Sequence, residues 1–558
     1  MNMPRYGFLM AGMLVNSAWA APGIDAGSLL QQIERDRHLQ IQPAESSNLR
    51  PLATPDDSRA QDGDIRFTVK KLIVLNVSVF DPQVLTQLLS DTLGQSVSLA
   101  QLRERIQRIT AYYHTHGYPA AYAYLPEQTI ADNGEVEVRV LEGYLGEIHL
   151  HNRSRLSDAA ARARLPKMKA GEVLAQTKIE RSAALENDIP GIAAQTAFNP
   201  GRDTGFTNID VTLTDRPVLT TQLSVDNQGN RYTGDGNRIM LRPEISNFTG
   251  YGDKLTANLL YGGFGMKYHA FQYQLPSYWT GDGRAGIEYS EVDYYLGREL
   301  LASGSQGTTR STGIFGSYPI VRGDALNVNV EMRHQEKMIR DIVQATKDTN
   351  ERRSYSESLT LSGDWRDNAV NVWSVGYVTG SLALLNPPRI ALDAASAQSM
   401  GHYHKSNWSY LRLQSLPWLE DATLSIALNG QINLGRNLDP SEKTVLGGAR
   451  GVRAYPANEG MSDNALLATV EVKKPITSQL QALLFADYGK GMSSSYPWPA
   501  VASSNRRELG GAGTGVKYQL AESAYLSLQC AWRTTRSKPL SGNDTPNGRV
   551  WIEFAWGL

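Results

Sequence analysis

The residues with the clearest chemical potential lie in two short stretches near the C-terminal end of the chain. The first, residues 446–460, reads LGGARGVRAYPANEG and has the Gly-rich composition of a loop, with Arg450 and Arg453 as its basic residues. The second, residues 485–489, reads FADYG and has the pattern of a strand that carries Asp487. A guanidinium fork suits a planar carboxylate better than a lysine ammonium does. The two stretches therefore offer Arg453 and Asp487 as a candidate ion pair.

The loop stretch resembles a motif of the Omp85 superfamily. Val452-Arg453-Ala454-Tyr455 is similar to the VRGY or VRGF motif at the tip of the sixth extracellular loop, with Ala454 in place of Gly. The VRAYP run and the acidic residues after it resemble the two-partner secretion transporters most, the outer-membrane pores that export large haemolysins and adhesins. The resemblance implies that this loop folds into a barrel lumen with Tyr455 packed beside Arg453. Ala tolerates positive φ poorly, so Ala454 leaves the tip geometry open.

The strand stretch is similar to the F-x-D-x-G motif on the barrel wall that receives this loop in the superfamily. Phe485, Asp487 and Gly489 occupy the three fixed positions. The resemblance implies that Arg453 and Asp487 lock the loop to the wall. The residues alone leave an alternative open, in which Arg453 is a solvated loop residue and Asp487 is an unrelated acid at a strand end.

The sequence contains no motif that predicts catalysis. It lacks a G-x-x-x-x-G-K-[ST] phosphate loop, an H-E-x-x-H pair and a G-x-S-x-G elbow. Residues 511–515, GAGTG, fit a strand packed close to a neighbour. His114 and His116, like His402 and His404, have neither a cysteine nor clustered carboxylates nearby, which disfavours a metal site. We expect no cofactor, no metal and no enzymatic activity.

The composition gives no sign of a nucleic-acid partner and is compatible with a membrane barrel. The chain has 55 Lys and Arg against 56 Asp and Glu, so its charge gives no indication of a nucleic-acid partner. It has 26 Tyr and 10 Trp, residues that transmembrane barrels gather at both membrane interfaces. The mean hydropathy of −0.36 is compatible with a barrel, because only alternate strand residues meet lipid.

The first residues predict export. Residues 1–20 have a basic Arg5, an apolar centre and a small-x-small site at 18–20, so we expect a signal peptide and a mature chain that begins near Ala21. No later window has about 18 consecutive apolar residues, which disfavours a transmembrane helix. Cys530 is the only cysteine, so we expect neither an intramolecular disulfide nor a lipid anchor at the mature N-terminus.

Residues 21–39 predict an amphipathic helix with Leu29, Leu30 and Ile33 on one side. A helix of about three turns is marginal alone, so it should dock on another part of the chain. The resemblance to two-partner transporters implies that it plugs the barrel lumen. The alternative is that it lies on the periplasmic domains. Residues 40–64 have the Pro-, Ser- and Asp-rich composition of a flexible linker.

Two αβ units follow, at residues 65–143 and 144–216. The first is expected to contain a strand at 67–79, helices that begin after Asp81 and Ser98, and strands at 121–125 and 135–141. The second is expected to contain a strand at 147–151, helices at 158–165 and 176–188, and strands at 192–199 and 208–214. This β-α-α-β-β order resembles POTRA domains. Residues 185–191, LENDIPG, resemble the L-x-N-D-x-P-G segment of the second POTRA domain in two-partner transporters.

Residues 217–558 lose the helical period and alternate with period two between Gly-, Asn- and Asp-rich connections, which predicts a transmembrane β-barrel of sixteen antiparallel strands. The strands are expected at 219–225, 238–246, 254–260, 268–275, 286–292, 312–318, 326–333, 355–365, 372–384, 406–416, 423–433, 465–472, 480–488, 511–519, 525–532 and 549–558. Counted from the periplasm, the sixth external connection covers residues 434–464 and contains the VRAY motif. In the last strand Val550, Ile552 and Trp556 point to one side, and Trp551 and Glu553 to the other.

The most favoured function is therefore an outer-membrane pore that captures one secreted exoprotein of the TpsA type through its POTRA domains and exports it without ATP. The exported partner would be a haemolysin, an adhesin or a contact-dependent toxin. Other expected partners are outer-membrane lipid and, during biogenesis, the barrel assembly machinery; we expect a monomer. The alternatives are an assembly factor for other barrels, which two POTRA domains and the N-terminal helix disfavour, and a porin or outer-membrane enzyme.

Overall fold

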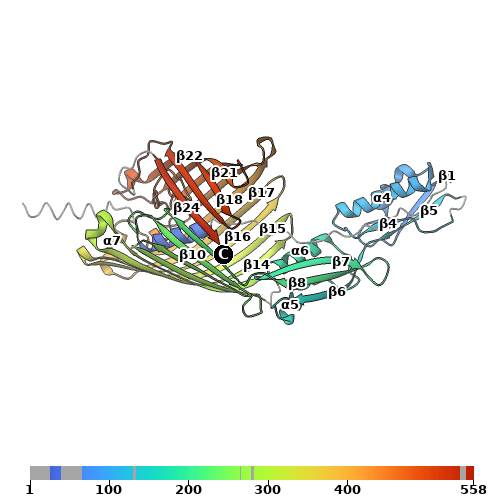
Figure 1. Cartoon of the computed structure of the whole chain (residues 1–558), viewed down its shortest axis with the longest axis horizontal. Coiled ribbons are helices and arrows are strands. Elements are labelled where there is room, and N and C mark those ends of the chain that lie inside the picture. The colour runs from blue at the N-terminus through green and yellow to red at the C-terminus, as the bar shows by residue number, and fades with distance from the viewer. Residues whose placement is uncertain (1–24, 39–65, 130–132, 264, 278–281, 541–547) are drawn as a thin grey trace, which may run out of the picture.

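The structure, a computed structural model, describes residues 25–38, 66–129, 133–263, 265–277, 282–540 and 548–558. Two αβ units lie in line at one end of the molecule and a β-barrel forms the other end (Figure 1). The predicted signal peptide, residues 1–20, and the predicted linker, residues 40–64, lie outside the described residues.

In the described part of the chain, sixteen antiparallel strands close into a barrel, each paired with the next in sequence, which confirms the predicted fold class. The strands are β9 (Leu219–Asp226), β10 (Arg238–Ser246), β11 (Lys254–Gly262), β12 (Met266–Pro276), β13 (Arg284–Tyr295), β14 (Ser305–Arg322), β15 (Leu326–Val343), β16 (Asp348–Arg366), β17 (Val370–Leu384), β18 (Gly401–Leu416), β19 (Ala422–Asn433), β20 (Asn464–Pro475), β21 (Leu480–Met492), β22 (Arg506–Ala521), β23 (Ala524–Arg533) and β24 (Gly548–Gly557). The barrel closes where residues 553–557 of β24 pair with residues 222–226 of β9.

The strands differ in length around the barrel. β14, β15 and β16 have 18, 18 and 19 residues, whereas β9, β10 and β11 have 8, 9 and 9. A tilted strand needs roughly 9–11 residues to cross a membrane, so β14–β16 extend well beyond one. The sequence predicted these three strands too short. Their outer halves carry polar residues on both faces, such as exposed His334 and buried Lys337 on β15, and this removes the apolar alternation.

The last strand shows the expected alternation. Val550, Ile552 and Trp556 are exposed on the outer surface, whereas Trp551 and Ala555 are buried on the inner side. Apolar side chains thus face the lipid, and the side chains between them face the interior.

The first αβ unit contains β1 (Arg66–Thr68), β2 (Lys71–Leu75), α3 (Pro82–Gln87), β3 (Ser96–Ser98), α4 (Leu99–Thr115), β4 (Tyr122–Tyr124) and β5 (Glu135–Leu141). The single strand predicted at residues 67–79 is wrong. The chain changes partner at Val69, because β1 pairs with β3 whereas β2 pairs with β5, and the φ of 60° at Asn76 ends the second strand. As predicted, Ser98 caps α4; it forms a capping box with Gln101.

The second αβ unit contains β6 (Tyr144–Arg153), α5 (Asp158–Arg164), α6 (Gln176–Asn187), β7 (Ile192–Pro200) and β8 (Phe206–Asp215), with the sheet order β6-β8-β7. Two further helices are α2 (Ala26–His38) and α7 (Pro387–Ala394). Among the described residues, none of the helices has the length and apolar character needed to cross a membrane.

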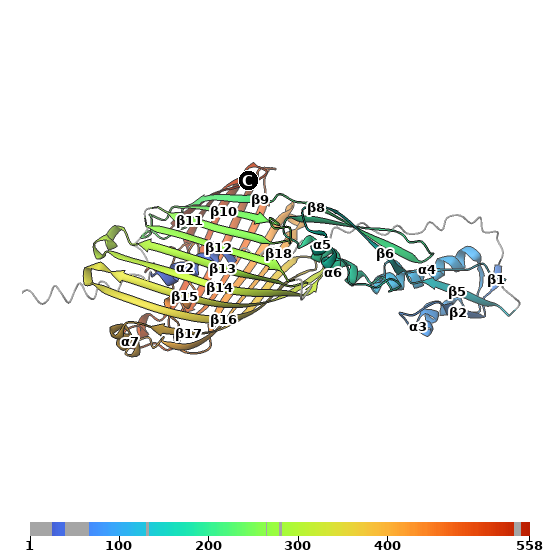
Figure 2. The ribbon, with the colours of Figure 1, turned by 90° about the horizontal axis from the view of Figure 1, so that it is seen from below.

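Helix α2 lies inside the barrel (Figure 2). Leu30 is fully buried and Leu29 nearly so, and both pack in one apolar cluster with inward side chains such as Leu260, Tyr268 and Val292. The helix therefore covers the inner wall formed by β11–β15. This position corresponds to the lumen-filling arrangement and not to the alternative on the αβ units.

Candidate functional site

The connection between β19 and β20, residues 434–463 and here called loop 6, folds back into the lumen. Its turn is closed by backbone hydrogen bonds from the Val452 N–H to the Leu446 carbonyl (2.8 Å) and from the Tyr455 N–H to the Val452 carbonyl (3.0 Å). One apolar cluster joins the loop to the wall: Leu446, Val452, Ala454, Tyr455, Leu467, Leu483, Phe485, Leu509 and Ala531. The loop tip is thus packed against the wall strands in the same way as side chains in a protein core.

Arg453 and Asp487 meet at the centre of this contact. The Nε and Nη2 atoms of Arg453 lie 2.9 and 2.8 Å from the two carboxylate oxygens of Asp487, and the Arg453 backbone N–H donates to the same carboxylate at 3.0 Å. Nη1 donates to Glu471 (2.8 Å), and Thr469 donates its hydroxyl to Asp487 (3.1 Å). The side chains of Arg453 and Asp487 are only 6% and 1% exposed. The pair is therefore bidentate and shielded from water.

The other wall residues shape the space around Arg453. The guanidinium carbon lies 3.4 Å from the ring centroid of Phe485, a cation–π geometry. A Cβ atom added to Gly489 would lie 2.8 Å from Val452 Cγ2, so a side chain there would push the loop away. Trp551 of β24 donates its indole N–H to the Arg453 carbonyl at 2.8 Å. The loop tip thus contacts β21 and also β24, the strand that closes the barrel.

Ala454 and Tyr455 complete the motif. Ala454 does not adopt a positive φ; in the loop this conformation falls on Gly448, Asn458 and Gly460. The Ala454 methyl instead packs on Gly511, where an added Cβ would lie 2.9 Å from it. Residues 511–515 lie in β22 and allow this close approach.

Tyr455 is fully buried, and its hydroxyl donates to the Ser537 carbonyl (2.8 Å) and lies 3.0 Å from the Thr535 hydroxyl. Tyr455 therefore shares the apolar cluster with Phe485 and extends the contact to the connection after β23.

A second charged contact holds the base of loop 6 and was missed from the sequence. Glu442, in the short helix η5 (Pro440–Glu442), lies between Lys337 of β15 (3.0 Å) and Lys405 of β18 (2.8 Å), and all three side chains are buried. Burial alone would raise the pKa of Glu442, but the two lysines lower it to about 2. Isolated strand lysines form no sequence motif, so no signal was available to find this site.

A third contact, also missed, joins loop 6 to α2. Arg352 of β16 contacts the carboxylates of Asp25 before α2, Asp341 of β15 and Asp439 of loop 6. A Cβ atom added to Gly27 of α2 would lie 2.5 Å from Ser441 Cβ. Helix α2 and loop 6 therefore touch each other as well as the wall.

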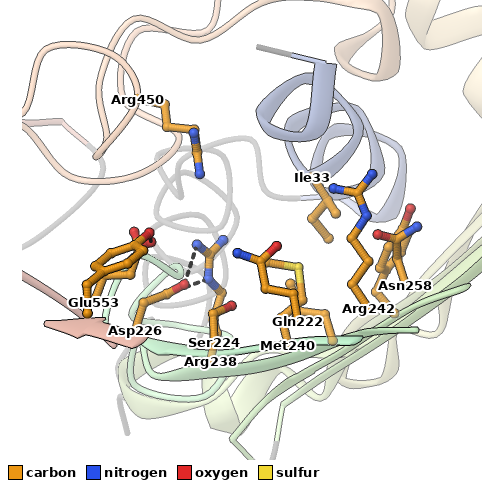
Figure 3. Close-up of a pocket in the computed structure, with 13 residues that line it drawn as sticks. Ile33, Gln222, Ser224, Asp226, Arg238, Met240, Arg242, Asn258, Arg450 and Glu553 are labelled. Carbon is orange, nitrogen blue, oxygen red and sulfur yellow. Dashed lines mark hydrogen bonds and ion pairs between the residues drawn. The ribbon is translucent and has the colours of Figure 1, made fainter. Parts of the chain in front are cut away.

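Between these elements lies a small cavity of about 70 Å³ against the strands that close the barrel. Figure 3 shows Ile33 of α2 and Arg450 of loop 6 on one side and Arg242 of β10 on the other. Arg238 forms an ion pair with Asp226 at its floor, with an Nε–Oδ1 distance of 2.8 Å. A larger polar cavity of about 470 Å³ lies on the other side of α2, and Gln31 and Glu34 line it. Residues of both α2 and loop 6 thus line each of these two cavities.

The second αβ unit docks on the barrel through the segment at residues 185–191. Asp188 accepts two hydrogen bonds from Arg322 at the end of β14, both at 2.9 Å, and its backbone carbonyl accepts one from Arg284 at 2.6 Å. In the same interface Arg181 donates to Asp282 at 2.9 Å. The end of α6 is therefore fixed to the turns at the near end of the barrel.

Comparisons with known proteins match the whole architecture. The family description "POTRA domain, ShlB-type" matches residues 67–143, and "Omp85 superfamily domain" matches residues 247–544. The heme/hemopexin transporter protein HuxB of Haemophilus influenzae is 28% identical over 97% of this chain and 96% of its own length. The outer membrane transporter CdiB of Dickeya dadantii is 22% identical over 70% of this chain and 69% of its own.

Solved structures agree on the fold. CdiB from Escherichia coli superposes with a TM-score of 0.71 at 18% identity, covering 96% of this chain and 99% of its own. CdiB from Acinetobacter baumannii superposes with a TM-score of 0.64 at 16% identity, over the full length of both chains.

Proposed function

Because the chain belongs to the Omp85 superfamily, and within it to the outer-membrane pores of two-partner secretion, we propose that α2 and loop 6 close its resting lumen. The barrel lies in the cell outer membrane, with the POTRA domains in the periplasm, and the pore serves a secreted exoprotein of the TpsA type. The observation that carries the gating proposal is the buried Arg453–Asp487 pair between loop 6 and the wall.

In this proposal the exported chain binds the POTRA domains unfolded and enters the barrel when α2 leaves. The contacts of α2 with β13–β15 and loop 6 block the same space that an exported chain needs. The Arg453–Asp487 pair keeps the loop tip on the wall strands β20, β21 and β24 while the rest of the lumen opens. This transport needs no catalytic residue, so we propose that the chain is not an enzyme.

We further propose that the exported partner takes part in the use of haem or hemopexin. HuxB is described as a heme/hemopexin transporter protein, and its similarity covers nearly the whole of both chains, whereas the similarity to CdiB of Dickeya dadantii covers about 70%. We also propose that the barrel acts as a monomer in outer-membrane lipid, after insertion by the barrel assembly machinery.

The test compares secreted and outer-membrane proteins of cells with and without this chain, then of cells with Asp487→Arg. Loss of one large secreted protein with other barrels intact is the expected result for the deletion. Asp487→Arg places a second cation beside Arg453, so we expect export to fall strongly while the barrel remains inserted and heat-resistant on a gel. The recovered exoprotein is then tested for binding of haem and hemopexin.

The matched control is Asp235→Arg in the connection between β9 and β10, where the side chain is 65% exposed. This variant should export normally. Normal export by Asp487→Arg would refute the proposed role of the pair. A broad fall in other barrel proteins after deletion would indicate an assembly factor instead, and an exoprotein that binds neither ligand would refute the proposed partner.

A further inference from the structure

Arg352 is the point at which α2, loop 6 and the barrel wall share one cation. Its Nη2 lies 2.9 Å from Asp25 Oδ2 and 2.6 Å from Asp341 Oδ2. Its Nη1 lies 2.8 and 3.0 Å from the two carboxylate oxygens of Asp439. The Arg352 side chain is 3% exposed, so these charges interact with little screening by water. Three carboxylates from three separate segments meet on one guanidinium.

The three carboxylates differ in how they contact Arg352 and in what else they contact. Asp439 makes the two-pronged contact that suits a guanidinium best. Asp341 also accepts the Tyr294 hydroxyl of β13 (2.9 Å), a contact within the barrel wall, and the Ala26 N–H (3.0 Å), which joins the wall to α2. Asp25 is the third anion, and it sits at the start of the only one of the three segments that is not part of the barrel or its loops.

The site therefore has an excess of negative charge while α2 is docked. Like charges brought together in a buried site disfavour their ionised forms. Burial, opposed by Arg352 and reinforced by Asp341 and Asp439, raises the pKa of Asp25 to about 6. When α2 leaves, Arg352 keeps two carboxylates, one of them bidentate, and Asp25 returns to water.

Loop 6 does not depend on α2 in the same way. Glu442 lies between Lys337 and Lys405, and Asp439 keeps its own contact with Arg352. The base of loop 6 thus has opposite charges to hold it in both states. The arrangement weakens one closing element and keeps the other in place.

We propose that Arg352 is a positioning residue shared by α2 and loop 6, and that Asp25, as the third carboxylate on it, weakens the docking of α2 so that the helix is ready to leave. This deepens the gating part of the proposed function and rests on it. A simple salt bridge between Asp25 and Arg352 would instead strengthen docking, so the two readings predict opposite effects of removing the Asp25 charge.

The experiment measures α2 docking directly in the purified full-length protein. Spin labels at Gln32 and Lys347, in a Cys530→Ser background, report the ratio of docked to undocked helix as a distance distribution. Asp25→Asn removes the charge but keeps the side-chain oxygen that accepts the Ser28 N–H, so the helix cap is preserved. We expect the docked ratio of Asp25→Asn at pH 7.5 to rise about tenfold or more.

Arg352→Gln should have the opposite effect and lower the docked ratio, because three carboxylates then lack their cation. The matched control is Glu34→Gln, which removes a negative charge from the same helix where it contacts Ser290 instead of Arg352. It should not raise the docked ratio, because the Glu34 charge is attracted by Lys337 of the wall. If Arg352→Gln fails to insert, the Asp25→Asn result alone decides.

The pH profile gives an independent readout. The docked pKa of Asp25 lies above its ordinary 3.8, so docking is strongest below about pH 4, weakens up to about pH 6 and stays constant above. Lowering the pH from 7.5 to 5 should raise the docked ratio about tenfold in the unchanged protein and leave Asp25→Asn unaffected.

A docked ratio that falls in Asp25→Asn would overturn the proposal, because it would identify a stabilising salt bridge. An unchanged ratio in Arg352→Gln would overturn it as well. Failure of the gating role is separable: if deletion of residues 26–38 leaves export and channel conductance unchanged, α2 is not a gate, whatever the charge variants do to its docking.

Discussion

At the scale of single residues, all three nitrogen atoms and the flat face of the Arg453 guanidinium make contacts. Nε and Nη2 pair with Asp487, Nη1 reaches Glu471 and Gln529, and the guanidinium face lies on Phe485. The planar fork makes these contacts simultaneously, which a lysine ammonium does not. At this position the planar shape of the guanidinium therefore matters as well as its positive charge.

The substitution Arg453→Lys tests whether the shape of the guanidinium matters in addition to its charge. The substitution keeps the charge but loses the bidentate contact and the ring stacking, which together are worth roughly 2 kcal/mol or more in a buried site. We expect amide hydrogen exchange across residues 446–460 to accelerate about thirtyfold, which corresponds to that loss. Arg450→Lys, in the same loop but outside the pair, should leave the exchange unchanged. Equal exchange in the two variants would contradict the importance of geometry.

At the scale of elements, three consecutive residues at the end of α6 make contacts with three different parts of the structure. Glu186 points into the second αβ unit and meets the hydroxyls of Ser182 and Thr196, both at 3.3 Å. Asn187 accepts the Ala194 N–H at 3.0 Å and so ties the helix to β7. Asp188 turns outward to the barrel. This division gives a physical reason for each polar residue of the segment 185–191.

We expect Glu186 to make the stability of the second αβ unit depend on pH. Burial raises the pKa of Glu186 to about 8, only partly offset by its two hydroxyl contacts. The folded pKa lies above the ordinary 4.5, so stability is full below about pH 4.5 and is lost as the pH rises towards 8. Between pH 4.5 and 7 the loss is roughly 3 kcal/mol.

The measurement is hydrogen exchange of the α6 amides in the whole protein at pH 5, 6 and 8, corrected for intrinsic rates. Glu186→Gln should remove the dependence, because a neutral amide does not titrate. Glu180→Gln on the same helix, at a half-buried position, should retain it. A dependence that persists in Glu186→Gln would show that another group is responsible.

At the scale of the whole molecule, the Arg322–Asp188 pair is one of the contacts that join the second αβ unit to the barrel. Arg322 is almost fully buried in the interface and pairs with Asp188 and with Asn327. Because the partner carboxylate is 29% exposed, the loss of this pair is expected to weaken the junction by about 2 kcal/mol.

Asp188→Asn should therefore broaden the distance distribution between spin labels at Gln195 in the second αβ unit and Thr477 on a periplasmic turn. Both positions are exposed, so the labels themselves do not disturb the interface. The matched control is Asp203→Asn, an exposed acid in the same unit, which should leave the distribution narrow. A narrow distribution in Asp188→Asn would mean that the remaining contacts suffice to orient the unit.

Features that depend on neighbouring residues or on motifs were predictable from the sequence, whereas contacts between distant segments were not. Alternation is local, so the faces of β24 and the count of sixteen strands were predictable from neighbours such as Val550 and Trp551. The proximity of Arg453 and Asp487 was predictable because both lie in motifs. Arg352 was not, because its contact with Asp439 depends on how loop 6 enters the closed barrel, which no local pattern encodes. The break at Val69 was missed because its partner strand is only three residues long.

The unequal strand lengths give the extracellular mouth of the pore an oblique rim. On the side of β14–β16 the strands are about ten residues longer than β9–β11, roughly 25 Å of additional height for tilted strands. An emerging polypeptide meets a tall sheet on one side and open water on the other. We expect it to be turned towards the low side as it leaves, so that folding begins over the membrane next to β9 and not along the axis of the barrel.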